Sequence, residues 1–322
     1  MKILITGGAG FIGSHLCREL LRLGHEVSIL DNLSTSQDSA IEEFKSNPSF
    51  SYTFDNITNS SVVTSLIEEA DFIYHLAAAV GVRLIIEKPI KSIETNVLGT
   101  EIILKAAASN KTPVFIASSS EVYGKTLDVP FQEDNTLAIG ATSNARWSYA
   151  CSKALDECIA LAYFNELDLP VIVGRLFNTV GPGQTGQYGM VLPNFVKQAL
   201  NDEDITVYGD GQQTRCFCHV SDTVQALIKL MQSTDGFGEV YNIGSTKEIS
   251  ILGLAERVRD IVASKSKIVT INYKEAYGKG FDDMQRRVPD ITKIRNHIGW
   301  EPTIELEQLI KSVMDDIKIS LG

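Results

Sequence analysis

No stretch of the sequence is a long uninterrupted apolar run, and the chain does not begin with a basic and then apolar leader that ends in a cleavage site. We therefore expect neither a membrane-spanning segment nor a signal peptide. Cysteine is scarce as well, and the five cysteines are odd in number and scattered, which argues against a disulfide framework. These absences together predict a cytoplasmic protein with reduced thiols.

Positive charge is also in short supply. The chain has 29 lysines and arginines against 40 acidic residues, a net charge of −11, and no basic patch stands out. Because such a surface would repel the phosphate backbone, we expect no nucleic-acid partner, and an anionic small substrate would need local arginines. Internal repeats and low-complexity tracts are missing too. A hydrophobic content of 44% over 322 residues is enough for a large core.

One short group of residues, Cys216, Cys218 and His219, could suggest a metal site. In a strand, Cys-x-Cys places both thiols on one face and the histidine on the other, so the three side chains do not converge. We interpret the thiols as buried packing residues and predict no metal ion.

Strands and helices are expected to alternate through the first half of the chain. Short apolar runs rich in β-branched residues predict strands, and apolar residues at helical spacing predict helices. The predicted strands are Lys2–Thr6, Glu26–Leu30, Phe50–Phe54, Phe72–Leu76, Val114–Ala117 and Val171–Arg175, and the predicted helices are 11–23, 60–69, 91–109 and 146–167. This alternation predicts an α/β fold with a doubly wound parallel sheet over residues 1–178.

The pattern changes after Gly181. The predicted helices are now 191–201, 221–232 and 250–263, with strands at 205–208 and 240–243. We expect a smaller mixed domain over residues 179–322, placed over the mouth of the sheet, with some late segments returning to the first domain.

A glycine-rich loop follows the first predicted strand and opens the first predicted helix. Gly7, Gly10 and Gly13 have the spacing G-x-x-G-x-x-G, which permits a tight turn, an approach of the backbone to a pyrophosphate, and close packing of helix and strand. Asp31 ends the second predicted strand, where its carboxylate can bind an adenosine ribose and would repel a 2′-phosphate. The pattern predicts NAD rather than NADP as the cofactor; the alternative for Asp31 is an ordinary turn residue.

Further residues are expected around this cofactor. Asn56 follows the third strand, where its amide can contact adenine. Leu76, Ala77 and Ala78 follow the fourth strand, where small side chains would let the cofactor lie across the strand ends, although tight helix packing explains the alanines nearly as well. The other expected cofactor contacts are Phe11, Ile12, Asn32, Ser34 and Ile57.

Tyr149 and Lys153 stand four residues apart on one face of a long predicted helix. An ammonium beside a phenol stabilises the phenolate, although a plain surface pair has the same spacing. Ser118-Ser119-Ser120 ends the fifth strand, at the edge where open α/β sheets bind ligands, although serine runs are also common in turns. Their convergence predicts a proton-transfer site: Tyr149 as base or acid, Lys153 lowering its pKa and holding the nicotinamide ribose, and Ser119 positioning the reacting oxygen.

Eight stretches, in this order, are similar to the motifs of one enzyme family. They are TGGAGFIG, DNLS, HLAA, SSSEVYG, SYACSK, RLFNTVGP, VYGDGQQTRCFCHVSD and RRVPD. On these motifs the chain resembles an extended short-chain dehydrogenase/reductase of the nucleotide-sugar epimerase/dehydratase family over nearly its whole length. The resemblance implies a Rossmann-type domain, a smaller C-terminal domain that binds the nucleotide sugar, and a homodimer through the helices at 91–109 and 146–167.

The same resemblance implies a UDP-sugar as the substrate. By position in the motifs, Asn178 would meet the diphosphate, Val207 and Tyr208 would lie near the base, and Arg215 and Arg287 would neutralise the diphosphate. The remaining expected substrate contacts are Gln187 and Val191.

Family members oxidise the sugar at C4, and the fate of the 4-keto intermediate sets the reaction. Return of hydride to the other face gives a 4-epimerase, loss of CO₂ from a C6 carboxylate gives a decarboxylase, and removal of water gives a 4,6-dehydratase. Dehydratases usually have Asp-Glu where this chain has Ser120-Glu121, so dehydration is not expected. Ser120 and Glu121, which we count among the catalytic residues, together with Arg215 resemble the UDP-glucuronate decarboxylases.

The predicted reaction is nevertheless 4-epimerisation of UDP-glucuronate/UDP-galacturonate or of UDP-glucose/UDP-galactose. The stretches RWS, RLFNTVGPGQTGQYGMVLPNF and EAYGKGFDDMQRRVPD look closer to bacterial UDP-sugar 4-epimerases. Gly183 and Gln187 stand where enzymes that act on uronates tend to have arginine, so a neutral hexose stays open. The alternative is a UDP-glucuronate decarboxylase that makes UDP-xylose or its 4-keto precursor. A non-enzymatic NAD sensor is not expected, because Ser119, Tyr149 and Lys153 are all present.

Overall fold

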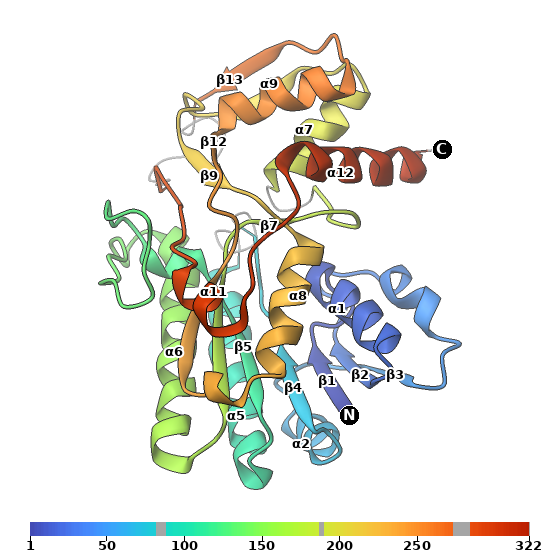
Figure 1. Cartoon of the computed structure of the whole chain (residues 1–322), viewed down its shortest axis with the longest axis vertical. Coiled ribbons are helices and arrows are strands. Elements are labelled where there is room, and N and C mark those ends of the chain that lie inside the picture. Colours follow the sequence, from blue (N-terminus) through green and yellow to red (C-terminus); the bar gives the residue numbers. More distant parts are fainter. Residues whose placement is uncertain (82–87, 187–189, 273–283, 322) are drawn as a thin grey trace.

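A seven-stranded parallel sheet forms the centre of the larger part of the molecule (Figure 1). This computed structural model describes residues 1–81, 88–186, 190–272 and 284–321. The strand order is β11-β6-β5-β4-β1-β2-β3, with every neighbouring pair parallel. The strands are β1 (Lys2–Thr6), β2 (Glu26–Asp31), β3 (Phe50–Phe54), β4 (Phe72–His75), β5 (Val114–Ser119), β6 (Val171–Leu176) and β11 (Glu239–Ile243). The predicted doubly wound α/β fold is confirmed.

Two layers of helices cover the two faces of this sheet. One face is packed by α1 (Phe11–Arg22) and α8 (Val220–Met231), together with α11 (Thr292–Ile298). The other is packed by α2 (Ser60–Glu68), α5 (Gly99–Asn110) and α6 (Ser148–Leu167). The central strands are almost fully buried and therefore read as continuous apolar runs, as expected for a parallel sheet with both faces covered.

The helix predicted over 91–109 is three consecutive segments. The α-helix α4 (Pro89–Ile93) is followed by a π-helical segment, η2 (Glu94–Leu98), and then by α5. The π segment turns Asn96 inward, where its amide donates to Ser152 Oγ on α6 at 3.1 Å and its carbonyl accepts from the Ala79 backbone at 2.8 Å. Such local wide turns are frequent at functional sites.

The second half of the chain contributes three small sheets and a separate group of helices. β7 (Thr179–Val180) pairs with β10 (Cys218–His219), β8 (Ile205–Tyr208) with β13 (Ile268–Ile271), and β9 (Thr214–Cys216) with β12 (Glu248–Ser250). The helices α7 (Val191–Leu200), α9 (Ile251–Val262) and α12 (Leu306–Leu321) share a core of their own and gather at the top of Figure 1. β11 and α8 return to the large sheet, and a boundary at residue 178 stays a prediction.

Short 3-10 turns complete the described elements. They are η1 (Asp38–Phe44), η3 (Ser120–Tyr123), η4 (Ala145–Trp147) and η6 (Thr234–Gly236). No helix in the described part of the chain is long and apolar enough to cross a membrane. Cys216 and Cys218 are buried, and burial raises the pKa of each thiol to about 12, while the described residues contain no cluster of metal-ligating side chains.

Candidate active site

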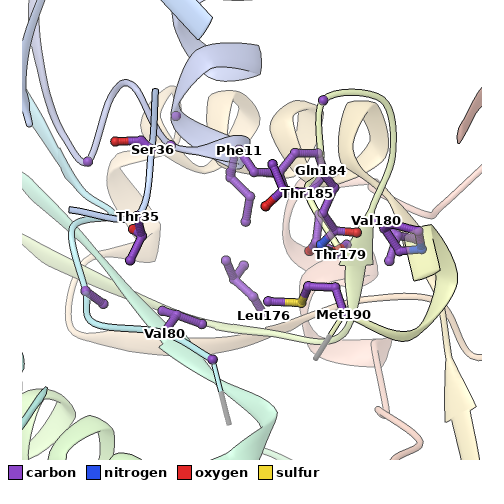
Figure 2. A pocket seen from close by; sticks show the side chains of 18 of the residues that line it. Phe11, Thr35, Ser36, Val80, Leu176, Thr179, Val180, Gln184, Thr185 and Met190 are labelled. Atoms are coloured by element: carbon purple, nitrogen blue, oxygen red, sulfur yellow. Dashed lines mark hydrogen bonds between the residues drawn. The ribbon is translucent and has the colours of Figure 1, made fainter. Parts of the chain in front are cut away.

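A cavity of about 2070 Å³ lies where the carboxyl ends of the large sheet face the second half of the chain. Figure 2 shows side chains from both halves around this cavity: Phe11 and Val80 from the first, and Gln184 and Met190 from the second. Ligands of open α/β folds bind at this edge of the sheet, so the cavity is the candidate active site.

The predicted site residues are largely gathered in its wall. Those that line it are Gly7, Gly10, Phe11, Ile12, Gly13, Asp31, Asn32, Ser34, Ile57, Leu76, Ala77, Ala78, Ser119, Ser120, Glu121, Tyr149, Lys153, Asn178, Val191, Tyr208, Arg215 and Arg287. Gln187 lies outside the described residues. Asn56 and Val207 do not line the cavity.

The glycine loop is built for a close backbone approach. Gly7 has a φ of +73°, and a Cβ there would lie 2.8 Å from the Ala77 nitrogen. A Cβ on Gly13 would lie 2.2 Å from the Gly7 carbonyl oxygen. Gly10 is the N-cap of α1 and has no side-chain cap, so the first N–H groups of the helix face the cavity. These residues fit the pyrophosphate of a dinucleotide such as NAD.

Asp31 is nearly buried and holds two loops together. One carboxylate oxygen accepts the Ala9 N–H at 3.0 Å, and the other accepts the Leu33 N–H and the Ser36 hydroxyl, both at 2.8 Å. The side chain therefore has the structural role of a turn residue as well as a place in the cavity wall. Its predicted contact with a ribose stays a prediction.

Two residues that were predicted to contact the cofactor or the substrate do not line the cavity, although an adjacent residue does in each case. Asn56 accepts a hydrogen bond from Asn32 at 3.0 Å, and Asp55 lines the cavity in its place. Val207 is fully buried in the core of the second half, because side chains alternate along β8. Thr206 and Tyr208 therefore face the cavity, and Thr206 is a lining residue that the sequence prediction missed although strict alternation from Tyr208 indicates it.

At the reacting end, Ser119 and Tyr149 face each other. Ser119 ends β5 and caps η3 by accepting the Glu121 N–H at 3.3 Å. Tyr149 lies in the first turn of α6, and the Ser119 side chain beside its phenol favours the ionised form. Burial raises the pKa of Tyr149, the charges of Glu121 and Asp156 raise it further, and Ser119 acts in the opposite direction.

Lys153 is buried and its ammonium is bound to Asp156, with Nζ and Oδ2 3.1 Å apart. The sequence predicts that Lys153 lowers the pKa of Tyr149, whereas in the structure that pKa is raised. The main physical reason is burial of the phenol, to which the charges of Glu121 and Asp156 add, and Asp156 also offsets the Lys153 ammonium within the same buried site.

Glu121 is the centre of a buried cluster of charges beside the serines. Its carboxylate lies 2.9 Å from Arg146 Nη1 and 2.7 Å from Arg287 Nη2. Arg146 comes from η4, immediately before the Tyr149 helix, and the sequence prediction did not include it among the site residues. The sequence does not show that Arg146 is buried beside Trp147, and only the structure reveals that this arginine needs a charged partner.

Two further polar side chains of the wall follow β6 in the chain. Arg215 lines the cavity and donates to the Thr214 carbonyl at 2.7 Å. Asn178 donates to the Cys216 carbonyl at 3.0 Å. The cavity thus combines an anion-binding loop, a hydroxyl pair and four arginines, Arg18, Arg146, Arg215 and Arg287, which suits a dinucleotide and a second anionic ligand.

Comparison with known proteins decides the family. Residues 4–313 match the family model described as GDP-mannose 4,6 dehydratase. The chain belongs to the NAD-dependent epimerase/dehydratase family. Members of this extended short-chain dehydrogenase/reductase family modify nucleotide sugars, and the predicted resemblance is confirmed.

One solved relative, a UDP-glucuronic acid 4-epimerase from Bacillus cereus, is crystallised with UDP-glucuronic acid and NAD. It is 28% identical, covers 99% of this chain and 100% of its own, and has a TM-score of 0.90. The predicted cofactor is thus confirmed for the family.

The predicted 4-epimerase activity is overturned by two decarboxylases. A UDP-N-acetyl-α-D-glucosaminuronate decarboxylase from Bacillus cytotoxicus is 43% identical over 97% of this chain and 96% of its own. UDP-glucuronic acid decarboxylase 1 from Danio rerio is 38% identical over 95% of this chain and 70% of its own. These identities exceed the 28% shared with the epimerase, so the alternative prediction from Ser120-Glu121 is the better supported one.

Proposed function

We propose that this protein is an NAD-dependent decarboxylase of a UDP-uronate, with UDP-glucuronate or its 2-acetamido analogue as substrate. The observation that carries the proposal is the buried Glu121 carboxylate, held between Arg146 and Arg287 next to the Ser119–Tyr149 pair. The two decarboxylase relatives support it.

The proposed chemistry begins at the sugar O4. NAD⁺ held at the glycine loop of Gly7, Gly10 and Gly13 would supply the hydride acceptor for oxidation at C4. The ionised form of Tyr149 Oη takes the proton from the O4 hydroxyl, while the Ser119 hydroxyl donates to the same oxygen and fixes its position. Because the pKa of Tyr149 is raised, the phenolate fraction and the rate of this step are expected to increase with pH. C4 then becomes a ketone, and a C6 carboxylate is β to that ketone.

Loss of CO₂ leaves an electron pair that is shared between C5 and O4. The O–H groups of Tyr149 and Ser119 both donate to the O4 oxygen, where the charge develops. Arg146 and Arg287 compensate the Glu121 carboxylate, so this buried cluster beside the serines has a net positive charge, which favours the negative charge that develops at O4. An epimerisation forms no such anion by loss of CO₂ and gains nothing from this positive charge.

The arginines bring the anionic substrate into an acidic protein. Arg215 and Arg287 both line the cavity, and guanidinium groups bind phosphate and carboxylate oxygens in pairs. In a chain with a net charge of −11, these side chains supply the local positive potential that a UDP-uronate needs.

The test is incubation of the purified protein and NAD⁺ with UDP-glucuronate and, separately, with UDP-N-acetylglucosaminuronate, followed by liquid chromatography and mass spectrometry. We expect a product lighter by CO₂ from at least one of the two. Its further mass shows whether the 4-ketone is reduced to the pentose or released. A product of unchanged mass, or no product from either substrate, would refute the proposal.

We also propose that the protein is a homodimer through α4, η2, α5 and α6. Apolar side chains on these elements are exposed in the single chain, among them Ile93, Leu98 and Leu155 at 43–47% of their surface. Sedimentation at micromolar concentration is expected to give twice the chain mass of 35.3 kDa. Leu155→Arg is expected to shift the protein toward the monomer because it places a charge in the contact. A wild-type monomer would contradict this.

A further inference from the structure

A third ionisable side chain shares the helix face of Tyr149 and Lys153. Asp156 follows Tyr149 by seven residues and Lys153 by three, so all three lie along one stripe of α6. Asp156 is fully buried, and it belongs to none of the motifs that predict the active site. A buried carboxylate is costly unless it is paired, so its presence on this stripe needs a reason.

The partner of Asp156 is the active-site lysine. Lys153 Nζ lies 3.1 Å from Asp156 Oδ2, with side-chain exposures of 2% and 0%. The other oxygen, Oδ1, is buried and has no hydrogen-bond partner among the residues that the structure describes. Thr100 on α5 lies beside the carboxylate and favours its charged form.

We propose that Asp156 is a positioning residue for the proton-transfer site: it binds the Lys153 ammonium and thereby controls how strongly that charge acts on Tyr149. The inference rests on the role of Tyr149 in the proposed function. It adds a carboxylate that touches neither substrate nor cofactor and works through its two neighbours on the helix.

The other charged groups around this site are already engaged. Glu157, the next residue on α6, is paired with Arg175 of β6 at 2.7 Å. Glu121 on η3 is bound by Arg146 and Arg287.

The one titratable group that faces the pair from the sheet, within the described residues, is His75 of β4. Burial and the Lys153 charge lower its pKa to about 3, so it is neutral at physiological pH. Its Nε2 lies 3.1 Å from Thr100 Oγ1, next to Asp156. Asp156 is therefore the only acid bound to Lys153 in the described part of the chain.

The direction of the effect follows from charge. Burial raises the pKa of Asp156, and Lys153 and Thr100 act against that rise. When Asp156 is ionised it opposes ionisation of the Tyr149 phenol and offsets the ammonium. A neutral residue at 156 removes a negative charge and leaves the Lys153 charge uncompensated. Both changes favour the phenolate, so the pKa of Tyr149 falls.

The experiment titrates Tyr149 directly and does not depend on the reaction. The ultraviolet absorbance of tyrosinate is followed against pH for the wild type and Tyr149→Phe, and their difference isolates Tyr149. The same difference is taken between Asp156→Asn and the double variant Asp156→Asn/Tyr149→Phe. We expect the Tyr149 midpoint at lower pH when Asp156 is neutral. An unchanged or higher midpoint would overturn the proposal.

Three further variants sharpen the result. Asp156→Ser is made in parallel, because its small side chain leaves room for water beside the buried ammonium, and the same downward movement of the midpoint is expected. Asp156→Glu keeps the charge and is expected to stay nearer the wild-type midpoint. Asp168→Asn removes an exposed acid that caps the same helix in a left-handed conformation that asparagine also adopts, and the midpoint is expected to stay in place.

The pH dependence of turnover gives a second, independent readout. If UDP-uronate decarboxylation is observed, its acidic limb moves to lower pH in Asp156→Asn. At a pH well below the midpoint, the phenolate fraction of Tyr149 rises about tenfold for a fall of about one unit in its pKa. If the wild type turns over neither uronate, the proposed function fails, while the absorbance titration still decides the role of Asp156.

Discussion

Tyr149→Phe is expected to lower the rate of CO₂ release by roughly 10²- to 10⁴-fold, the usual contribution of a positioned proton-transfer group. The phenylalanine ring fills the same buried space beside Ser119 but cannot accept the O4 proton. Affinity for NAD is expected to change little, because the glycine loop, the predicted site of the pyrophosphate, is untouched. Single-turnover CO₂ release and fluorescence titration with NADH measure the two quantities.

The matched control for this variant is Tyr163→Phe. Tyr163 stands on the same helix, about four turns away, and packs against the core of the sheet face rather than the cavity. Loss of the Tyr163 hydroxyl is expected to leave the turnover rate within a factor of about two of the wild-type rate. Equal activity in wild type and Tyr149→Phe would show that another group moves the O4 proton.

The second large effect concerns stability. Arg175 on β6 and Glu157 on α6 form a buried pair, with Nε–Oε1 at 3.0 Å and Nη2–Oε2 at 2.7 Å. Arg175 also donates to the Tyr123 hydroxyl at 2.8 Å, and Ser118 donates to Glu157. Arg175→Met leaves Glu157 buried without its cation, and the free energy of unfolding is expected to fall by about 3–5 kcal/mol.

Urea denaturation measures this loss as a lower midpoint at an unchanged slope. The double variant Arg175→Met/Glu157→Leu removes both charges and should be more stable than Arg175→Met alone. Arg22→Met breaks an exposed pair with Glu19 and serves as the surface control, with little expected change. If Arg175→Met were as stable as the control, the buried pair would have no part in holding α6 against the sheet.

The regular part of the fold is predictable because local signals agree with one another. The strand Lys2–Thr6 and the helix from Phe11 are joined by a loop whose glycines stand where a Cβ would collide with neighbouring backbone, so the loop has few possible backbone conformations. The π-helical segment at Glu94–Leu98 carries no such signal, since its extra residue per turn is stabilised by the inward contacts of Asn96 with distant parts of the chain. Local periodicity cannot report a contact of that kind.

The site residues that were predicted wrongly or missed also depend on features that local sequence signals do not show. Asn56, which follows the end of β3, and Val207, which lies in β8, are each one residue away from a lining position. In a strand such as β8, a single step turns a side chain to the other face. The cluster around Glu121 joins residues that are 25 and 166 positions away in the sequence, Arg146 and Arg287. Sequence order predicted where the serines and Tyr149 would meet, but it did not predict which charges would surround them.

The reaction was the least predictable feature, because the proposed oxidation at C4 is common to epimerisation and decarboxylation. The choice between epimerisation and decarboxylation depends on what surrounds the C6 group. Ser120-Glu121 indicated decarboxylation, whereas longer stretches outside the reacting end favoured epimerisation, and those stretches were the poorer guide.

The position of β11 at the edge of the large sheet has a consequence for how the chain is made. β11 pairs with β6, but 62 residues separate the end of β6 at Leu176 from the start of β11 at Glu239. During synthesis from the N-terminus, the outer edge of β6 stays uncovered until residue 243 has emerged. During that interval the apolar edge of β6, which is buried in the complete fold, is open to pairing with other chains. Truncations that end before β11 are therefore expected to aggregate.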